Sequence, residues 1–159
     1  MKPFIPILES LVKNNNETSR RPITILEIGV HKGVSTNTFL NAIQARNRDG
    51  DRLYSIDVRD VPYKVYGSTE SYWHLIKGDS ANVPWDKEID ILLIDGNHTY
   101  QYVKSDYEKF EPFVRKGGII LLHDMTNYKY DGPKYWPEIK YPKIILDMGR
   151  NGMGIVTKI

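Results

Sequence analysis

Three long apolar runs constrain the fold of this chain more than any other feature of its sequence. They are rich in Ile, Leu and Val, and they lie within residues 23–33, 89–98 and 118–124. Runs of this length without polar alternation are typical of strands buried on both faces, as in a parallel sheet flanked by helices. The sequence therefore predicts an α/β fold, in which ligands bind beyond the carboxyl ends of the strands.

The composition excludes several classes of protein. The 159 residues carry 22 basic and 20 acidic side chains, and a net charge of +2 provides no strong field for nucleic acid or a membrane surface. Cysteine is absent, which excludes disulfides, thiolate zinc sites and a cysteine nucleophile. The first 16 residues are too short and too interrupted for a secretory leader or a membrane span. We expect a single soluble domain over residues 1–159, located in the cytoplasm.

Strand and helix signals alternate along the chain. Ser35 is a plausible N-cap for a helix after the first strand, and apolar residues at helical spacing between Tyr100 and Val114 predict a second helix, ended by Gly117 and Gly118. An N-terminal helix within residues 1–16 is expected from its amphipathic pattern. Strands are expected at residues 23–29, 52–58, 75–77, 89–95 and 118–124.

The C-terminal residues, 143–159, predict two strands joined by a tight turn that contains Asn-Gly, and hence an antiparallel hairpin. Together with the alternation of strands and helices, this predicts a three-layer Rossmann-like sandwich with a mostly parallel seven-stranded sheet.

The turn after the first strand contains Glu27, Gly29 and Gly33. Glycines at such a turn let backbone N–H groups face a ligand at close range. His31 and Lys32 stand where a diphosphate-binding loop has its middle glycine, and Glu27 would repel a diphosphate. An acid at this place suits a cationic or neutral ligand such as an amino group. The alternative is a tight turn that binds nothing.

Acidic residues also end the next two strands. Asp57 ends the second strand, where a carboxylate can accept the hydroxyls of a ribose. Asp79 and Ser80 end the third strand, near the expected place of an adenine. Each residue alone is a weak signal, because Asp is a common turn former. Together with Glu27 they predict a nucleoside site.

The order of these motifs resembles that of a known family. LEIGVHKGVST, LYSID, LIKGDS, LLIDGNHTY and FVRKGGIILLHD are similar to the successive motifs of class I S-adenosylmethionine-dependent methyltransferases. Within that superfamily they most resemble the metal-dependent O-methyltransferases, in the branch of macrocin-type sugar O-methyltransferases and cephalosporin hydroxylase-like proteins. The resemblance covers residues 23–124, the expected cofactor and metal core.

The resemblance implies S-adenosylmethionine as cofactor and a role for each motif. Glu27, Gly29 and Gly33 would hold its methionine portion, Asp57 its ribose, and Asp79 with Ser80 its adenine. Asp95, at the end of the fourth strand, would border both the cofactor and a metal.

A divalent metal is the second implied group. Asp95 and His98 follow the fourth strand, and His123 and Asp124 end the fifth. Because these strands are expected to be neighbours, Asp95 and Asp124 can converge on one cation such as Mg²⁺ or Mn²⁺. The similar enzymes have an acidic or amide residue where His123 stands. His123 would therefore favour a softer ion, such as Mn²⁺, Fe²⁺ or Zn²⁺, or would act behind the ligands.

His98 is the expected general base. The similar sugar methyltransferases have a His at this Asp-x-x-His position, and the unperturbed pKa of a histidine, ~6.5, is close to the operating pH. With Asp95 as its catalytic partner at the metal, His98 would take the proton of an acceptor hydroxyl. The alternatives are a His98 that bonds locally at the helix start and a His123 that packs behind Asp124.

The acceptor is expected to be a small hydroxylated molecule or a glycan, because two basic and aromatic loops follow the second and fifth strands. Either the cleft is open to a large acceptor, or a second subunit completes it in a homo-oligomer. The alternative for the second loop is that Trp136 and Ile139 anchor a short helix on the sheet. The loop residues are Arg59, Tyr63, Lys64 and Tyr66, and Tyr128, Lys129, Tyr130, Lys134, Tyr135 and Trp136.

Other functions stay open at the level of sequence. A non-catalytic nucleoside-binding domain would keep the fold without turnover. A nicotinamide-dependent oxidoreductase is disfavoured by Glu27 and the missing middle glycine. Two carboxylates with histidines also resemble the ligand set of an iron oxygenase.

Overall fold

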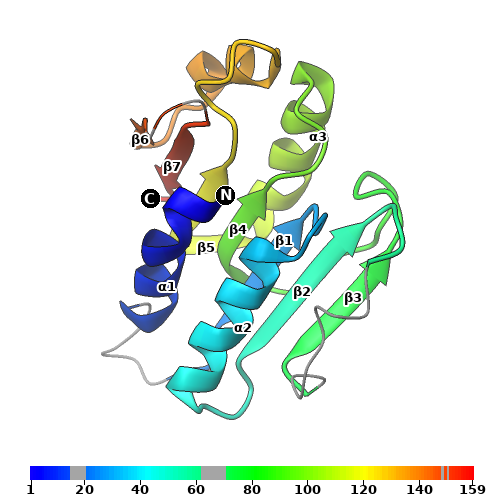
Figure 1. Ribbon diagram of the computed structural model, residues 1–159, viewed down its shortest axis with the longest axis vertical. Helices are drawn as coiled ribbons and strands as arrows, with labels where there is room; N and C mark the ends of the chain where they lie inside the picture. The colour runs from blue at the N-terminus through cyan, green and yellow to red at the C-terminus, as the bar shows by residue number, and fades with distance from the viewer. Residues whose placement is uncertain (15–20, 62–70, 148, 150) are drawn as a thin grey trace.

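The chain forms one seven-stranded sheet with the strand order β3-β2-β1-β4-β5-β7-β6 (Figure 1). The structure is a computed structural model, and it describes residues 1–14, 21–61, 71–147, 149 and 151–159. The strands are, in chain order, β1 (Thr24–Ile28), β2 (Arg52–Asp57), β3 (Trp73–Lys77), β4 (Ile89–Ile94), β5 (Val114–Leu122), β6 (Lys143–Leu146) and β7 (Met153–Thr157).

The pairing of the strands confirms the predicted sheet. β1 pairs in parallel with β2 and β4, β2 with β3, and β4 with β5. β7 is antiparallel to both of its neighbours, β5 and β6. Five parallel strands are thus followed by an antiparallel pair. The carboxyl ends of β1, β2, β3, β4 and β5 meet at one edge of the sheet.

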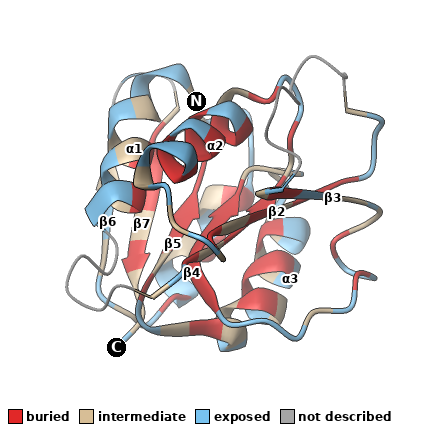
Figure 2. Ribbon diagram, turned by 90° about the horizontal axis from the view of Figure 1, so that it is seen from below, coloured by how far each residue is buried: buried red, intermediate tan, exposed pale blue. Residues whose placement is uncertain are grey.

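Helices cover both faces of this sheet (Figure 2). α1 and α2 lie on one face and α3 on the other. The helical segments are η1 (Lys2–Phe4), α1 (Ile5–Asn14), α2 (Val34–Arg46), α3 (Tyr100–Phe110), η3 (Glu111–Phe113) and η4 (Gly132–Glu138).

The apolar side chains form one cluster on each face. On the α1 and α2 side, Phe4, Leu8 and Phe39 pack together with alternate residues of the central strands. On the α3 side, Phe110 and Tyr135 pack with the other residues of the same strands. All six residues of β4 are buried, which explains why its sequence shows no polar alternation.

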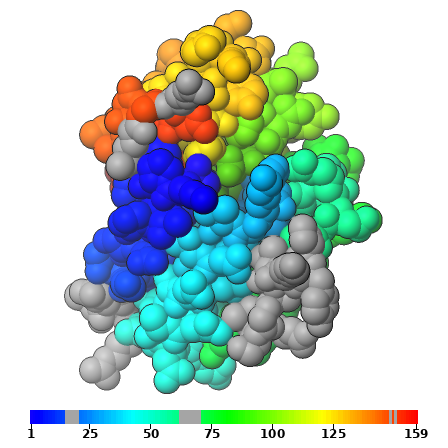
Figure 3. All heavy atoms as spheres, in the orientation of Figure 1, coloured from blue at the N-terminus to red at the C-terminus, as the bar shows by residue number. Residues whose placement is uncertain are grey.

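The N-terminal segment lies against the C-terminal strands as well as against α2. Figure 3 shows the dark-blue N-terminal residues beside the orange and red C-terminal ones. Phe4 shares its apolar cluster with Met153 of β7. The two ends of the described chain therefore stabilise the same face of the sheet. No helix in the described part of the chain is both long and apolar enough to cross a membrane.

Two predicted boundaries were wrong. The helix from Tyr100 ends at Phe110, and Val114 begins β5 by pairing with Ile89. Pro112 explains this difference, because it has no N–H to continue the helix. Gly117 and Gly118 lie inside β5 at an irregularity in its register with β4, where the pairing shifts between Ile89 and Ile91.

The predicted N-cap was also wrong. α2 begins at Val34 after Gly33, which has a φ of 69°, and no side chain caps the helix. Ser35 lies in the first turn of α2, where its hydroxyl donates to Glu27 instead. The residue that looked like a cap therefore belongs to a buried polar network.

The predicted loops are described only in part. Tyr63, Lys64 and Tyr66 lie outside the described residues, as do two positions of the β6–β7 turn, 148 and 150. The anchoring role of Trp136 and Ile139 is confirmed. Ile139 is buried, and the Trp136 ring lies so close to Gly154 that a Cβ there would come within 2.6 Å of it.

Candidate active site

A close approach of two strand ends sets the geometry of the site. Gly29 follows β1 with a φ of 92°, and a Cβ built on it would lie 2.3 Å from the backbone oxygen of Asp95. The N–H of Asp95 donates to the carbonyl of Ile28 at 2.8 Å. Only glycine combines this φ with this contact. The first glycine of the motif therefore places Asp95 beside the turn after β1.

A cavity of about 330 Å³ opens at the carboxyl ends of β1, β2, β3 and β4. Four of the residues predicted for the cofactor line it, namely Gly29, Asp57, Asp79 and Ser80. The rest of its wall comes from Ile28, Ile56, Val58, Arg59, Gly78, Gly96, Asn97, Tyr102 and Asp106.

Asp57 shapes the turn between β1 and α2. Its Oδ2 accepts the N–H groups of Val30 at 2.9 Å and His31 at 3.1 Å, and its Oδ1 accepts the N–H of Arg59 at 2.9 Å. Burial opposes its charge, but these backbone donors outweigh burial and lower its pKa. Asp57 is therefore an ionised carboxylate that joins two turns at the wall of the cavity.

Glu27 occupies a different place from the one predicted. Its side chain is fully buried beneath the turn, and it does not line the cavity. It accepts the hydroxyls of Ser35, Thr36 and Ser55, the last two at 2.7 Å. Burial raises the pKa of Glu27 to about 7 despite these donors. In this structure Glu27 supports the turn from below, and Gly33 caps α2 without lining the cavity.

The far wall of the cavity contains an acid that the sequence analysis did not assign. Asp106 of α3 is buried, and its Oδ1 accepts the hydroxyl of Ser80 at 2.6 Å. Burial raises the pKa of Asp106 to about 6. The sequence did contain a signal for Asp106. Its helical spacing from Val103 and Phe110 puts this acid on the buried face of α3.

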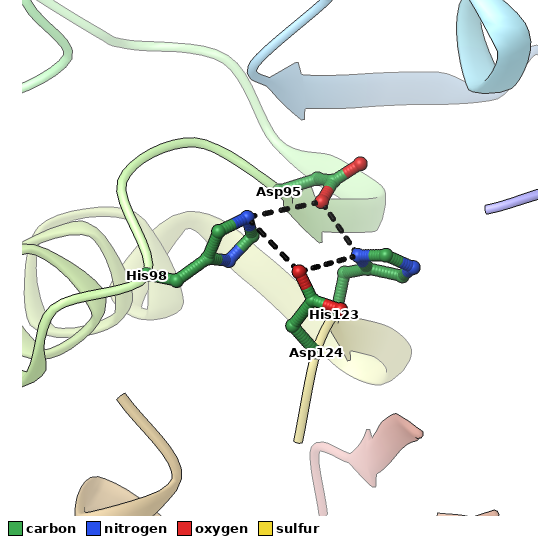
Figure 4. A group of neighbouring side chains, drawn as sticks. All are labelled: Asp95, His98, His123 and Asp124. Atoms are coloured by element: carbon green, nitrogen blue, oxygen red, sulfur yellow. Dashed lines mark ion pairs between the residues drawn. The ribbon is translucent and has the colours of Figure 1, made fainter. Parts of the chain in front are cut away.

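Four side chains from the ends of β4 and β5 converge beside this cavity (Figure 4). Asp95, His98, His123 and Asp124 point toward one another, and one ligand atom from each lies within 4.8 Å of the others. His123 Nδ1 lies 2.8 Å from Asp95 Oδ1 and 3.5 Å from Asp124 Oδ2. His98 Nε2 lies 3.3 Å from Asp124 Oδ2 and 3.8 Å from Asp95 Oδ1. The two strands thus bring together all four residues singled out in the sequence.

Two buried atoms of this cluster make no hydrogen bond of regular geometry with the described residues. They are Asp124 Oδ1 and His123 Nδ1, the second of which is nevertheless in ion-pair contact with Asp95 Oδ1. A buried polar atom without a partner is costly, and a cation held between such atoms would remove that cost. Two carboxylates and two imidazoles are also a donor set that divalent metals use. The residues present therefore fit a metal ion.

The two histidines differ in electrostatics. Burial lowers the pKa of His98 even though Asp95 and Asp124 oppose the shift. Burial acts in the same direction on His123, but Asp124 and Asp95 outweigh it and raise the pKa to about 9. The lowered pKa favours a neutral His98 at neutral pH, whereas the two carboxylates favour the charged form of His123. The Nε2 of His123 also lies 3.0 Å from the amino nitrogen of Met1.

The loop after β5 holds His98 from the outer side. The Tyr130 ring packs on the His98 ring with centroids 4.7 Å apart, and the N–H of Gly132 donates to the His98 carbonyl at 2.9 Å. Asp124 has a φ of 60°, which is strained for a residue with a side chain. Strain of this kind is typical of functional sites.

The comparisons with known proteins agree with this architecture. A sequence model described as a methyltransferase domain matches residues 26–125, more than half of the chain. The chain therefore belongs to this family of methyltransferase domains, and its fold is that of the class I S-adenosylmethionine-dependent enzymes. The family match favours this class over an oxidoreductase or an oxygenase.

Two relatives found by sequence are longer than this chain. An uncharacterized protein of Acanthamoeba polyphaga mimivirus is 29% identical over 153 residues, which cover 89% of this chain and 66% of that protein. An uncharacterized protein of Sinorhizobium fredii is 24% identical over 137 residues, which cover 75% of this chain and 15% of that protein. The chain thus spans just under two thirds of one relative and a small part of the other.

Two solved structures illustrate the shared fold. The MycE methyltransferase of the mycinamycin biosynthetic pathway, in complex with Mg, SAH and mycinamycin VI, has a TM-score of 0.66 at 18% identity. The match covers 98% of this chain and 49% of that one. CalS11, a TDP-rhamnose 3'-O-methyltransferase of calicheamicin biosynthesis, has a TM-score of 0.74 at 16% identity, over 98% and 79% of the two chains.

Proposed function

We propose that this chain transfers the methyl group of S-adenosylmethionine to a hydroxyl of a sugar-like or other small hydroxylated acceptor, with the help of a divalent metal. The observation that supports this most is the position of the Asp95, His98, His123 and Asp124 cluster beside a nucleoside-sized cavity. Asp95 connects the two, because its backbone contacts the Gly29 turn and its carboxylate belongs to the cluster.

The cavity suits the adenosine part of the cofactor. Gly29 leaves room for close approach of the ligand, and Asp57 stands at the end of β2, where the fold class binds a ribose. Asp79 and Ser80 form the wall beyond β3. The buried Glu27 would contribute indirectly. It accepts the hydroxyls of Ser35 and Thr36 and so fixes the turn between β1 and α2 that begins at Gly29. S-adenosylmethionine supplies the electrophilic methyl group when it is bound there.

The cluster suits the metal. Asp95, Asp124 and His123 would hold it, and Asp124 Oδ1 is a buried oxygen that accepts no hydrogen bond from the described residues. Imidazole nitrogens favour Mn²⁺ and similar ions over Mg²⁺, which prefers oxygen ligands. A divalent cation there would lower the pKa of an acceptor hydroxyl.

His98 then acts as the general base. Its lowered pKa leaves the ring neutral at neutral pH, as a base requires. With S-adenosylmethionine bound, His98 Nε2 would take the proton of the acceptor hydroxyl as the hydroxyl oxygen takes the methyl group from the sulfonium, which would leave as S-adenosylhomocysteine. Asp124 Oδ2, 3.3 Å away, stabilises the imidazolium that forms. Tyr130 holds the ring in place.

The acceptor side is aromatic and open. Tyr128 is 90% exposed, and Tyr130 is about half-exposed above His98. Tyrosine faces of this kind stack on sugar rings. A glycan or a small hydroxylated molecule therefore fits this rim better than a nucleic acid, given the nearly neutral net charge. A second subunit in a homo-oligomer could cover the rim, and cytoplasmic location stays our expectation.

The second candidate is a nucleoside-binding domain without turnover, which the histidine at position 123 motivates. A direct test separates the two. Methyl transfer from labelled S-adenosylmethionine to a panel of sugars and nucleotide sugars is measured with Mn²⁺ and with chelator, for the wild type and for Asp124→Asn. Asp86→Asn serves as the control, because Asp86 is a surface acid paired with Lys87. Transfer that needs both Mn²⁺ and Asp124 supports an enzyme, whereas cofactor binding without metal binding supports the second candidate.

A further inference from the structure

Asp106 is a buried acid with one oxygen that the proposed chemistry leaves unused. It comes from α3, is 2% exposed, and accepts the Ser80 hydroxyl with its Oδ1. Its Oδ2 accepts no hydrogen bond from any described residue. This oxygen lies 3.9 Å from the point where a Cβ on Gly96 would stand, and Asp106 and Gly96 both line the cavity. Because Asp106 lines the cavity, this oxygen is placed to accept a donor from a ligand in the cavity.

The position of Asp106 within the cavity indicates which part of a nucleoside it meets. Gly29 and Asp57 lie where β1 and β2 end. Ser80, which follows β3, and Asp106, which comes from α3, are joined by a hydrogen bond and form another part of the wall. A nucleoside whose ribose lies at Asp57 therefore directs its base toward Asp106. Tyr102, one helical turn before Asp106, lines the same cavity.

We propose that Asp106 recognises the amino edge of the purine ring of the cofactor and selects a 6-amino purine against a 6-oxo purine. The inference rests on the proposed function, since it concerns the same cofactor. An ionised carboxylate only accepts hydrogen bonds, so it pairs with the exocyclic amino group of adenine. A 6-oxo group offers another acceptor at that place and leaves both oxygens unpaired. Burial makes such a mismatch costly.

Asp79 is less suited to this selection, although the sequence analysis assigned it to the adenine. Its Oδ1 accepts the N–H of Ala81 at 3.0 Å in a local turn, and its side chain is partly exposed. Water can satisfy an exposed carboxylate when the ligand does not. Asp106 is 2% exposed, and a ligand that fills the cavity would displace the water from it, so Asp106 discriminates more strongly than Asp79.

The test measures binding of two ligands by calorimetry, S-adenosylhomocysteine and its 6-oxo analogue S-inosylhomocysteine. We expect the wild type to bind the adenine compound about 10- to 100-fold more tightly. Asp106→Asn introduces an amide donor of the same size, and we expect it to reduce that ratio at least about tenfold. Asp79→Asn removes an equal charge from the same cavity, and we expect it to keep most of the ratio.

The outcomes separate the inference from the proposed function. Equal affinity of the wild type for the two ligands would overturn the inference without any variant, even if Asp106→Asn failed to fold. A ratio that Asp79→Asn abolishes and Asp106→Asn keeps would also overturn it. Absence of S-adenosylhomocysteine binding to the wild type would contradict the proposed function itself, and the inference with it. A ratio that depends on Asp106 alone supports both.

Discussion

Asp95 Oδ1 and His123 Nδ1 lie 2.8 Å apart, although 28 positions separate them in the sequence and they follow different strands. The contact arises because β4 and β5 are parallel neighbours whose register brings Ile94 beside Leu122. The residues that follow these two must then meet at the same edge of the sheet. The candidate metal site is thus a direct consequence of strand order.

Removal of either carboxylate from the cluster should abolish metal-dependent transfer. Asp95→Ala and Asp124→Ala each delete a charged ligand, whereas the wall of the cavity formed by Asp57 and Ser80 stays in place. We expect affinity for S-adenosylhomocysteine to remain within a few-fold of the wild type. Transfer and Mn²⁺ binding are measured together, and full activity of both variants in chelator would show that the metal mechanism is wrong.

Replacement of the proposed base should affect turnover more than binding. His98→Gln keeps a polar side chain of similar size but cannot take a proton at neutral pH. We expect the rate of transfer to fall about 10²- to 10⁴-fold, with affinities for cofactor and Mn²⁺ nearly unchanged. If His98 were instead a metal ligand, the affinity for Mn²⁺ would fall along with the rate, and calorimetry distinguishes the two cases.

Glu27 should make stability depend on pH. Its pKa is raised from 4.5 to about 7 in the fold, so the folded chain binds more protons than the unfolded chain between these values. The free energy of unfolding therefore decreases as pH rises through this window, by roughly 3 kcal/mol at most. Glu27→Gln should remove this part of the slope in urea unfolding at pH 5, 6 and 7.5. An unchanged slope in the variant would mean that Glu27 is ionised throughout.

Gly29 should not tolerate even a methyl group. A Cβ there would lie 2.3 Å from the Asp95 backbone, at a φ that side chains rarely adopt. We expect Gly29→Ala to cost about 3 kcal/mol or more and to weaken both cofactor and metal binding. Gly149→Ala is the matched control, because Gly149 has a φ of 102° but nothing within 4 Å. That variant should show only the conformational cost, about 1–2 kcal/mol. Equal losses in the two variants would exclude the contact with Asp95 as the cause.

Cofactor binding should weaken in mild acid if Asp106 accepts from the purine. Burial and the charge of Asp79 raise the pKa of Asp106 to about 6, while Ser80 and Lys109 act in the opposite direction. Below that pH the carboxyl is protonated and no longer accepts, so affinity for S-adenosylhomocysteine should fall by up to tenfold per pH unit. In Asp106→Asn the affinity should depend less on pH. A wild-type affinity that is constant from pH 5 to 8 would contradict the prediction that Asp106 accepts from the purine.

The sequence predicted the sheet and the convergence of Asp95, His98, His123 and Asp124 because both follow from strand order. The apolar residues 91–94 of β4 required cover on both faces, and Asp95 and Asp124 were placed by the ends of neighbouring strands. Both predictions depend only on the spacing of apolar and polar residues within short segments, and this spacing can be read directly from the sequence.

The buried polar network was beyond sequence reasoning. Glu27 meets Ser35 and Ser55, hydroxyls from α2 and from β2, and nothing in the local sequence of any one of them indicates the others. Asp106 pairs with Ser80, 26 residues away. These contacts are set by how α2 and α3 pack on the sheet, so only the folded chain reveals them.

The most direct test of the central claim is a calorimetric titration of S-adenosylhomocysteine into metal-free protein, repeated with excess Mn²⁺. The methyltransferase account predicts micromolar binding in both titrations and a separate heat of binding for Mn²⁺ that Asp124→Ala removes. Absence of S-adenosylhomocysteine binding in both titrations would contradict the account.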